Sequence, residues 1–344
     1  MTHSRNTRLL ASLLLNVCLG YAWAAGATDF RLTTPDALHL LERVVPGASA
    51  LEATESNLKG RAGFRVAGKI GSDQYEAEID AEVPRVISVL KNGVRHYEWL
   101  GVFAVGHRGT IRFAPENTIS AFKKAIELGA HVVEMDVRET KDGHFVIMHD
   151  ATVFRTTGAK GVVSELTLNE IKQLDAGANF GPEFAREHVP TLEEVLDAIA
   201  GKALPDIDLK AGDIPKLVGL LRERGLLEQV TVASGNARFL QKVADLSGGK
   251  AIIRPALPEE PDPVVALQKG LDPPLVNIDD LSRFQEIHLH GMKVFTNAMS
   301  ERGDEEQRIK TAIAAGADYI QTDRLDILVP LLKEQGLYAP QPQP

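Results

Sequence analysis

Short apolar segments alternate with amphipathic ones from residue 100 onward. Eight apolar runs have the length and composition of strands: 102–105, 131–137, 205–210, 229–234, 251–255, 274–279, 293–297 and 319–323. Between them, apolar residues recur at helical spacing in segments 117–128, 191–200, 214–225, 237–246, 263–270, 282–291 and 305–316. Strands that are joined by helical crossovers in this way predict an α/β fold, a (β/α)8 barrel of the TIM type over residues 100–336. We expect residues 337–344 to form a disordered tail.

A further apolar run, HFVIMHD at 144–150, follows the second predicted strand after only a Lys-Asp-Gly turn. A parallel crossover needs about a dozen residues or more, so this run predicts an antiparallel β-hairpin that leaves the barrel after its second strand. If residues 139 and 144 pair across the turn, His149 lies opposite Glu134.

The segment before the barrel predicts a small α+β domain over residues 28–99. Apolar residues at helical spacing run from Pro35 to Gly47, and residues 63–70, 74–81 and 85–93 alternate apolar and polar side chains as strands do. The helix followed by strands resembles a PepSY domain, a small module of exported bacterial proteins. This resemblance implies a binding or inhibitory role toward a protein partner that the sequence does not identify.

The N-terminus predicts a signal peptide over residues 1–25. Arg5 and Arg8 precede an apolar stretch that is short for a membrane span, and Ala22-Trp23-Ala24 fits a cleavage site. An uncleaved anchor or a buried helix is the alternative. Cleavage predicts an exported protein, periplasmic or secreted, without stable membrane insertion. Cys18, the only cysteine, would leave with the signal, so the mature chain would depend on its core alone.

The charge balance argues against nucleic acid as a partner. Removal of the signal arginines leaves 36 basic residues against 47 acidic ones, a net charge of −11.

Polar side chains gather where the predicted strands end, which is where barrels carry their chemistry. Glu134 and Asp136 share one face of the second strand because side chains alternate along a strand, and Asp208 lies on the third. Carboxylates from adjacent strands form an oxygen-rich site for a hard divalent ion, Mg²⁺ or Ca²⁺, whereas zinc would favour nitrogen or sulfur ligands.

The same rim carries fixed positive charge and histidines. Arg108 and Lys210 favour an anionic substrate, and His107 and His149 are suited to proton transfer on either side of it. A phosphodiester has two P–O–C linkages, and the oxygens that take part in its cleavage need proton transfer. The set therefore predicts phosphodiester chemistry on a small molecule.

An ordered series of motifs now becomes informative: GHRG (106–109), PENT (115–118), EMDV (134–137), TKDG (140–143), VIMHD (146–150), RTTG (155–158), LTLNEIKQLDAG (166–177), VPTLEEVL (189–196), DLK (208–210) and QTD (321–323). Over residues 101–330 the series resembles the glycerophosphodiester phosphodiesterase family. The resemblance implies a (β/α)8 barrel that uses a divalent cation to cleave glycerophosphodiesters to glycerol 3-phosphate and an alcohol. The roles that it implies are catalysis by His107 and His149, metal binding by Glu134, Asp136 and Asp208, and phosphate binding by Arg108 and Lys210.

Two positions depart from the family pattern. The third metal ligand is usually Glu in an E-x-K motif, and here Asp208 is one methylene shorter. A late strand that usually reads Trp-Thr-Val-Asn is Val294-Phe295-Thr296-Asn297 in this chain, which leaves the alcohol specificity open.

Other polar residues have structural interpretations. Glu116 and Asn117 are expected to support the site from behind, with Asn117 or Thr118 as a helix N-cap. Asp206 is expected to orient Lys210 from a deeper position. Asp323 fits either the barrel mouth or a cap, and for His288 the pattern favours the surface.

Two other functions remain open at this point. One is a phospholipase D-like or sphingomyelinase D-like enzyme of the same barrel type, which would act on intact lipids and need an exposed apolar rim. The other is a non-enzymatic PepSY-type binding protein whose barrel has lost its activity.

Overall fold

The computed structural model describes residues 49–58, 61–70, 72–81, 85–256, 273–289, 291–300 and 302–341. The expected signal peptide, the helix expected at 35–47 and the helix expected at 263–270 lie outside the described residues.

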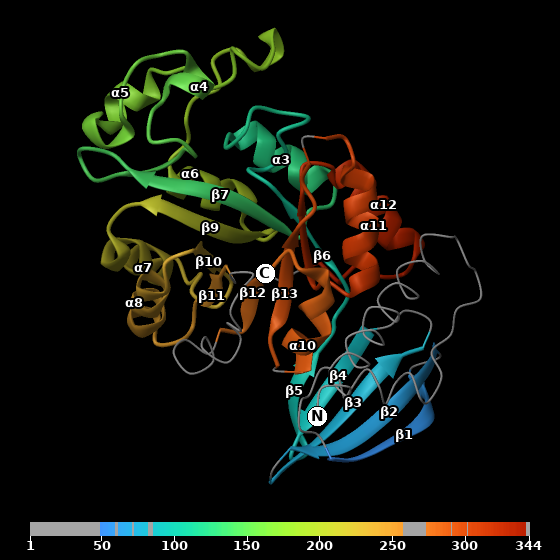
Figure 1. Cartoon of the computed structure of the whole chain (residues 1–344). Helices are drawn as coiled ribbons and strands as arrows, with labels where there is room; N and C mark the ends of the chain where they lie inside the picture. Colours follow the sequence, from blue (N-terminus) through green and yellow to red (C-terminus); the bar gives the residue numbers. More distant parts are fainter. Residues whose placement is uncertain are drawn as a thin grey trace, which may run out of the picture.

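A parallel barrel forms the larger part of the molecule, as the alternating pattern predicted (Figure 1). Its strands, in spatial order, are β11(Ile252–Pro255), β10(Thr231–Ser234), β9(Leu204–Ala211), β7(Val132–Glu139), β6(Phe103–Gly106), β14(Tyr319–Thr322), β13(Lys293–Asn297) and β12(Leu275–Asn277). A bridge between Ala256 and Asn277 brings β11 beside β12, so the sheet is nearly closed. The carboxyl ends of all these strands therefore meet at one mouth.

Helices cover the outside of the barrel. They are α3(Ile119–Glu127), α6(Leu192–Ile199), α7(Ile214–Glu223), α8(Ala237–Ser247), α10(Phe284–Leu289), α11(Glu305–Ala315) and α12(Leu325–Glu334), of which α12 was not predicted. Their apolar faces bury residues such as Phe122, Leu192 and Leu328 completely against the strands. Thr118 caps α3 by accepting the Ala121 N–H, so the N-cap is Thr118 rather than Asn117.

The hairpin after β7 is present, but its predicted register is wrong by one residue. β8(Phe145–Ile147) pairs antiparallel with β7, with Val137 opposite Ile147 and Glu139 opposite Phe145. The turn is longer than expected because two bonds join Thr140 and His144 within it: the Thr140 N–H donates to the His144 carbonyl at 2.8 Å, and the His144 N–H donates to the Thr140 hydroxyl at 2.9 Å. His149 therefore does not lie opposite Glu134.

An insertion of residues 148–190 follows β8 and projects beside the barrel mouth (Figure 1). It contains the short helices α4(Phe154–Thr157), η1(Val163–Glu165), α5(Leu168–Lys172) and η2(Pro182–Phe184). A separate small core anchors it to β8; its members include Val146, Met148, Val153, Ile171 and Val189.

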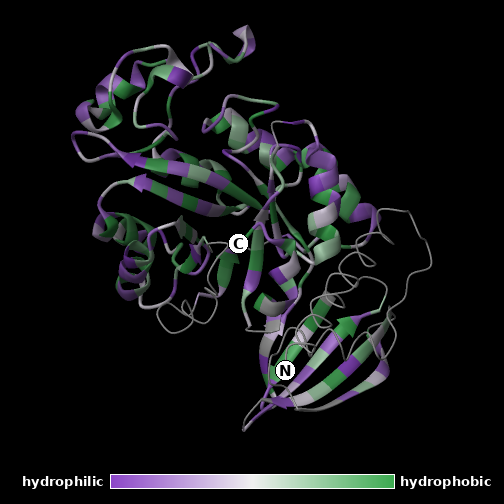
Figure 2. Ribbon diagram, viewed as in Figure 1, coloured by the Kyte–Doolittle hydropathy of each residue, from purple (hydrophilic) through white to green (hydrophobic). Residues whose placement is uncertain are grey.

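The described N-terminal part is a five-stranded antiparallel sheet. Its strands are β1(Ser49–Leu58), β2(Arg61–Ile70), β3(Asp73–Asp80), β4(Arg85–Lys91) and β5(Val94–Glu98), of which β1 and β5 were not predicted. Hydrophobic and hydrophilic residues alternate along them, as Figure 2 shows. This alternation is typical of a sheet with one covered face.

The N-terminal sheet docks on the barrel at the amino ends of β13 and β14. The Tyr97 hydroxyl donates to Asp318 Oδ1 at 2.8 Å, and the Val86 N–H donates to Gln285 of α10 at 2.9 Å. His288 is fully buried there, 2.8 Å from Asp318 and stacked on Tyr97, so its expected surface position is wrong. The sheet thus lies at the end of the barrel opposite the mouth.

Residues 337–341 are ordered, contrary to the expected disordered tail. Tyr338 forms a bridge with Val102, and Leu337 and Ala339 are buried. His131 holds this segment in place, because its Nε2 donates to the Ala339 carbonyl at 2.9 Å while its Nδ1 accepts the Ala104 N–H at 2.9 Å. The C-terminal segment closes the base of β6.

Among the described residues, no helix combines the length and the hydrophobicity that a membrane span requires.

We predict that His131 makes stability depend on pH between about 6.5 and about 4. Burial lowers the pKa of His131 to about 4, whereas the unfolded chain protonates it near 6.5. The unfolded state therefore binds more protons in this window, and the free energy of unfolding should fall by up to about 3 kcal/mol as the pH drops through it.

Urea unfolding of the wild type and His131→Asn measures this effect. The variant lacks the titrating group, so its stability deficit should shrink as the pH falls from 7 to 4. A deficit that stays constant across this range would contradict the prediction.

Candidate active site

The loop after β6 begins with a turn that requires its glycines. A Cβ at Gly106 would lie 2.3 Å from the Gly109 carbonyl oxygen, and one at Gly109 would lie 2.6 Å from the backbone of Ala121 in α3. Gly109 also has φ +82, and Arg108 between them is left-handed at φ +49. A non-glycine residue in this region costs about 1–2 kcal/mol, so the packing of this loop holds Arg108 in a strained position.

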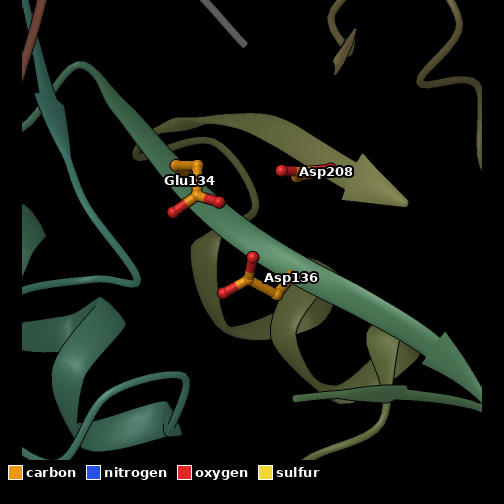
Figure 3. Close-up of side chains that lie close together, drawn as sticks. All are labelled: Glu134, Asp136 and Asp208. Carbon is orange, nitrogen blue, oxygen red and sulfur yellow. The ribbon is translucent and has the colours of Figure 1, made fainter. Parts of the chain in front are cut away.

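Three carboxylates meet on the neighbouring strands β7 and β9 at the barrel mouth (Figure 3). Glu134, Asp136 and Asp208 each place an oxygen within 4.8 Å of the others. The register between the strands explains the cluster, since Asp136 lies beside Asp208 while Glu134 lies beside Asp206. The structure therefore brings together the three residues that were predicted to hold a metal, and the shorter Asp208 still reaches the group.

Crowding of these carboxylates dominates the local electrostatics. Burial raises the pKa of Glu134 well above its ordinary value, and repulsion from Asp136 and Asp206 raises it further. For Lys210, burial opposes the charged form, but Asp136 and Asp208 outweigh it and raise the lysine pKa. The lysine Nζ lies 2.6 Å from Asp208 and 3.1 Å from Asp136.

The loop after β6 supplies further partners for the carboxylates. The Arg108 backbone N–H donates to Glu134 at 2.9 Å, and its guanidinium Nε lies 3.2 Å from Asp136. Asn117, itself left-handed at φ +58, donates to Asp136 from its amide at 2.8 Å. Glu116 accepts a bond from Arg108 Nη1 at 3.0 Å. Glu116 and Asn117 thus support the site through the residues that face the cavity, as expected.

His107 is oriented by a residue that the sequence left ambiguous. Its Nδ1 lies 2.8 Å from Asp323 Oδ1. An ionised carboxylate can only accept, so Nδ1 carries the proton and Nε2 is the nitrogen left for chemistry. The predicted closure of the barrel could have indicated this pair. Closure places Thr322 of β14 beside Gly106 of β6, so the residues that follow them, Asp323 and His107, lie side by side.

His149 has a similar carboxylate partner but a different position. Its Nδ1 lies 2.7 Å from Asp150 Oδ1, and Arg138 of β7 donates to its backbone carbonyl at 2.7 and 3.0 Å. Its side chain borders a small crevice that Glu116 and Asn117 also line. Asp150, unlike Asp323, was not among the residues weighed from the sequence.

A cavity of about 220 Å³ occupies the barrel mouth. The predicted site residues in its wall are His107, Arg108, Glu134, Asp136, Asp208 and Lys210. His149 is not among the described residues of this wall and lies in the adjoining crevice instead. The structure therefore gathers six of the predicted residues around one space and places the second histidine beside it.

The opposite wall of the cavity contains polar residues that the sequence analysis did not assign. They are Ser234, Arg254, Asn277, Asn297 and Gln321.

Arg254 is the charged partner of Asp206. Its guanidinium donates to Asp206 at 2.8 Å and lies 3.8 Å from the centre of the Phe295 ring. Burial raises the pKa of Asp206, and Arg254 counteracts this effect. The partner of Asp206 is thus Arg254, whereas Lys210, its expected partner, binds Asp136 and Asp208.

The donor set fits a hard divalent cation. It consists of carboxylate oxygens alone, which Mg²⁺ and Ca²⁺ prefer. A divalent cation among Glu134, Asp136 and Asp208 would also offset their mutual repulsion, which Arg108 and Lys210 relieve only in part.

Comparisons with known proteins place the barrel region in a family. Residues 107–327 match the glycerophosphoryl diester phosphodiesterase family. The glycerophosphodiester phosphodiesterase of Caldanaerobacter subterraneus subsp. tengcongensis is 37% identical over 250 residues, which cover 67% of this chain and 98% of that protein.

Solved structures share the fold. The glycerophosphodiester phosphodiesterase of Agrobacterium tumefaciens has a TM-score of 0.61 and 29% identity, covering 67% of this chain and 99% of that one. A phosphodiesterase of Oleispira antarctica, in complex with its product sn-glycerol-3-phosphate, has a TM-score of 0.60 at 24% identity, covering 68% and 97%. The second similarity supports the fold alone. The family match and the Caldanaerobacter relative show more: this chain belongs to the glycerophosphoryl diester phosphodiesterase family.

Proposed function

We propose that the protein hydrolyses glycerophosphodiesters, the deacylated forms of phospholipids, to glycerol 3-phosphate and an alcohol. The observation that carries this proposal is the single cavity in which His107 and Arg108 face the cluster of Glu134, Asp136 and Asp208. The relative that is 37% identical is itself a glycerophosphodiester phosphodiesterase.

The cavity suits a small polar diester. Lys210 and Arg108 lie on the carboxylate side and can bind the phosphate oxygens, while Asn277, Asn297 and Gln321 offer amide groups to hydroxyls on the other side. Charge-assisted bonds from guanidinium or ammonium groups to phosphate are stronger than neutral ones. A volume of about 220 Å³ leaves little room for acyl chains.

A divalent cation, Mg²⁺ or Ca²⁺, would be held by Glu134, Asp136 and Asp208. When bound, it would supply positive charge to stabilise the phosphorus oxygens during displacement. Asn117 and Arg108 hold Asp136 from the protein side, which fixes the orientation of the carboxylate.

The two histidines divide the proton transfers. Asp323 and Asp150 hold the Nδ1 protons of His107 and His149, so each ring presents Nε2 as the working nitrogen. One Nε2 takes the proton of the attacking hydroxyl, and the other donates a proton to the leaving alkoxide. His107 borders the cavity directly, whereas His149 reaches the substrate from the crevice beside it.

We also propose that the protein works outside the cytoplasm. The support is the N-terminal sequence, with Arg5 and Arg8 before an apolar stretch and Ala22-Trp23-Ala24 after it. Cleavage near Ala24 or Ala25 would release a mature enzyme without cysteine, and the N-terminal sheet would travel with it.

We predict metal-dependent release of glycerol 3-phosphate from glycerophosphocholine. Chelation should lower the rate on the order of 100-fold, because the carboxylate cluster then repels the phosphate, and Mg²⁺ or Ca²⁺ should restore it. A coupled assay for glycerol 3-phosphate measures this. No turnover with any divalent ion would rule out the proposed activity, and unchanged turnover in EDTA would rule out the metal requirement alone.

Intact phospholipid serves as the comparison substrate in the same assay. Phe154 and Phe180 are exposed on the insertion, at 62% and 42%, so the apolar residues that a lipid-acting enzyme needs are present to some extent. We expect the deacylated diester to be preferred because the cavity is small and polar. Preference for the acylated substrate would favour the phospholipase D-like alternative.

We predict that His107→Ala and His149→Ala each lower kcat by about 10²–10⁴-fold, because each removes one proton transfer. Asp323→Asn should lower kcat by about 10–100-fold, since the histidine loses the acceptor that fixes its tautomer. His188→Ala, an exposed histidine on the insertion, is the matched control. Near-full activity in either alanine variant, with the fold verified by circular dichroism, would remove that histidine from the mechanism.

A further inference from the structure

Arg155 joins two parts of the site that come from separate chain segments. From the single turn of α4, its Nε donates to Asp150 Oδ2 at 2.6 Å. Its Nη1 and Nη2 donate to Glu116 Oε2 and Oε1 at 2.6 and 2.7 Å. All three nitrogens of the planar guanidinium thus donate to one of two carboxylates.

Each of these carboxylates holds a residue of the proposed chemistry. Asp150 uses its other oxygen to accept from His149 Nδ1 at 2.7 Å, and Glu116 accepts from Arg108 Nη1 at 3.0 Å. The result is an unbroken row from His149 through Asp150, Arg155 and Glu116 to Arg108. It connects the crevice that holds the second histidine with the cavity that would hold the phosphate.

We propose that Arg155 is a positioning residue that sets the His149 imidazole and the Arg108 guanidinium at a fixed spacing for the reaction. This inference rests on the proposed function. It explains how His149, which lies outside the cavity wall, is kept aligned with a group inside it.

The backbone beneath Arg155 is well anchored. Val153 is fully buried in the small core of the insertion, and the Thr157 hydroxyl donates to its carbonyl at 2.7 Å. Thr156 contacts Met148, the residue before His149. The guanidinium therefore extends from a fixed base that is packed on the same segment as the histidine.

Stability alone is a poor explanation for these ion pairs. The Arg155 side chain is 46% exposed, and exposed ion pairs contribute little to stability because water and salt screen them. Geometry is the larger effect, since a planar guanidinium that binds both oxygens of Glu116 fixes direction as well as distance.

The network also keeps the histidine partner ionised. Hydrogen bonds from Arg155 lower the pKa of Asp150 to about 2, with His149 adding to the effect. The pKa of Glu116 is raised by burial, but Arg155 and Arg108 outweigh this and lower it. Both carboxylates therefore remain acceptors at any working pH.

Charged groups from several elements surround His149. Asp150 lies on its own segment, Arg138 donates to its carbonyl from β7, Glu116 borders the same crevice, and Arg155 approaches from α4. Substitution of Arg155 should free Asp150 to rotate, so the tautomer of His149 is the direct readout.

Kinetics of Arg155→Gln test the proposal. We expect kcat/KM on glycerophosphocholine to fall by about 10–100-fold, with kcat lowered through His149 and KM raised through Arg108. Arg155→Lys should recover only part of the loss and remain about 10-fold below wild type, because one ammonium cannot match both carboxylates. Arg186→Gln, an exposed arginine of the same insertion, is the control that should retain wild-type kinetics.

A double-mutant cycle separates positioning from independent effects. Asp150→Asn and Glu116→Gln interrupt the row on either side of Arg155. If the row acts as a unit, adding Arg155→Gln to the Asp150→Asn, Glu116→Gln double variant should change kcat/KM by less than about 2-fold. Full multiplication of the separate effects would overturn the proposal.

Nitrogen NMR of the His149 ring gives a test that does not depend on turnover. The wild type should show the proton on Nδ1, and Arg155→Gln should show a mixture of tautomers. Retention of the pure Nδ1–H form, or kcat/KM within about 2-fold of an active wild type, would overturn the role of Arg155. Absence of activity in the wild type would instead overturn the proposed function. If Arg155→Gln fails to fold, Arg155→Lys decides the question through the same two measurements.

Discussion

Crowding of three carboxylates on the neighbouring strands β7 and β9 is the constraint on which the rest of the site depends. Glu134 and Asp136 are buried and Asp208 is half-buried, so their mutual repulsion would destabilise the fold unless donors and cations surrounded them. Lys210, the Asn117 amide and the strained backbone of Arg108 supply that compensation. The conformation of the loop after β6 is therefore explained by the carboxylates that it faces.

The sequence was sufficient to predict the barrel, because local patterns of apolar and polar residues specify its strands and helices. Alternating strands and amphipathic helices located every barrel strand, and a turn too short for a crossover identified the β7–β8 hairpin. The hairpin register was beyond this reasoning, because it depends on the backbone and side-chain bonds that join Thr140 and His144 within the turn. Likewise, the order of residues 337–341 depends on a bond from His131, which is distant in sequence.

The site was predictable to the extent that its residues follow strand ends. The three carboxylates, both cations and His107 were identified on that basis, and the cavity contains all of them. The partners of the histidines were harder to find. Asp323 becomes a neighbour of His107 only when β14 closes on β6, and the link from Asp150 to Glu116 requires the fold of the insertion to place Arg155 between them.

The partner of His107 belongs to the barrel and the partners of His149 belong to the insertion, and this difference has consequences for substrate choice. Asp323 follows a barrel strand, so the orientation of His107 is as rigid as the barrel itself. Asp150 and Arg155 belong to an insertion with its own small core, so the orientation of His149 depends on a unit that can vary while the barrel stays the same. An enzyme built in this way keeps the phosphate site and His107 fixed on the barrel. Changes in the insertion would then alter the position of His149, and with it the substrate groups that its proposed proton transfer can reach, without disturbing the carboxylate cluster.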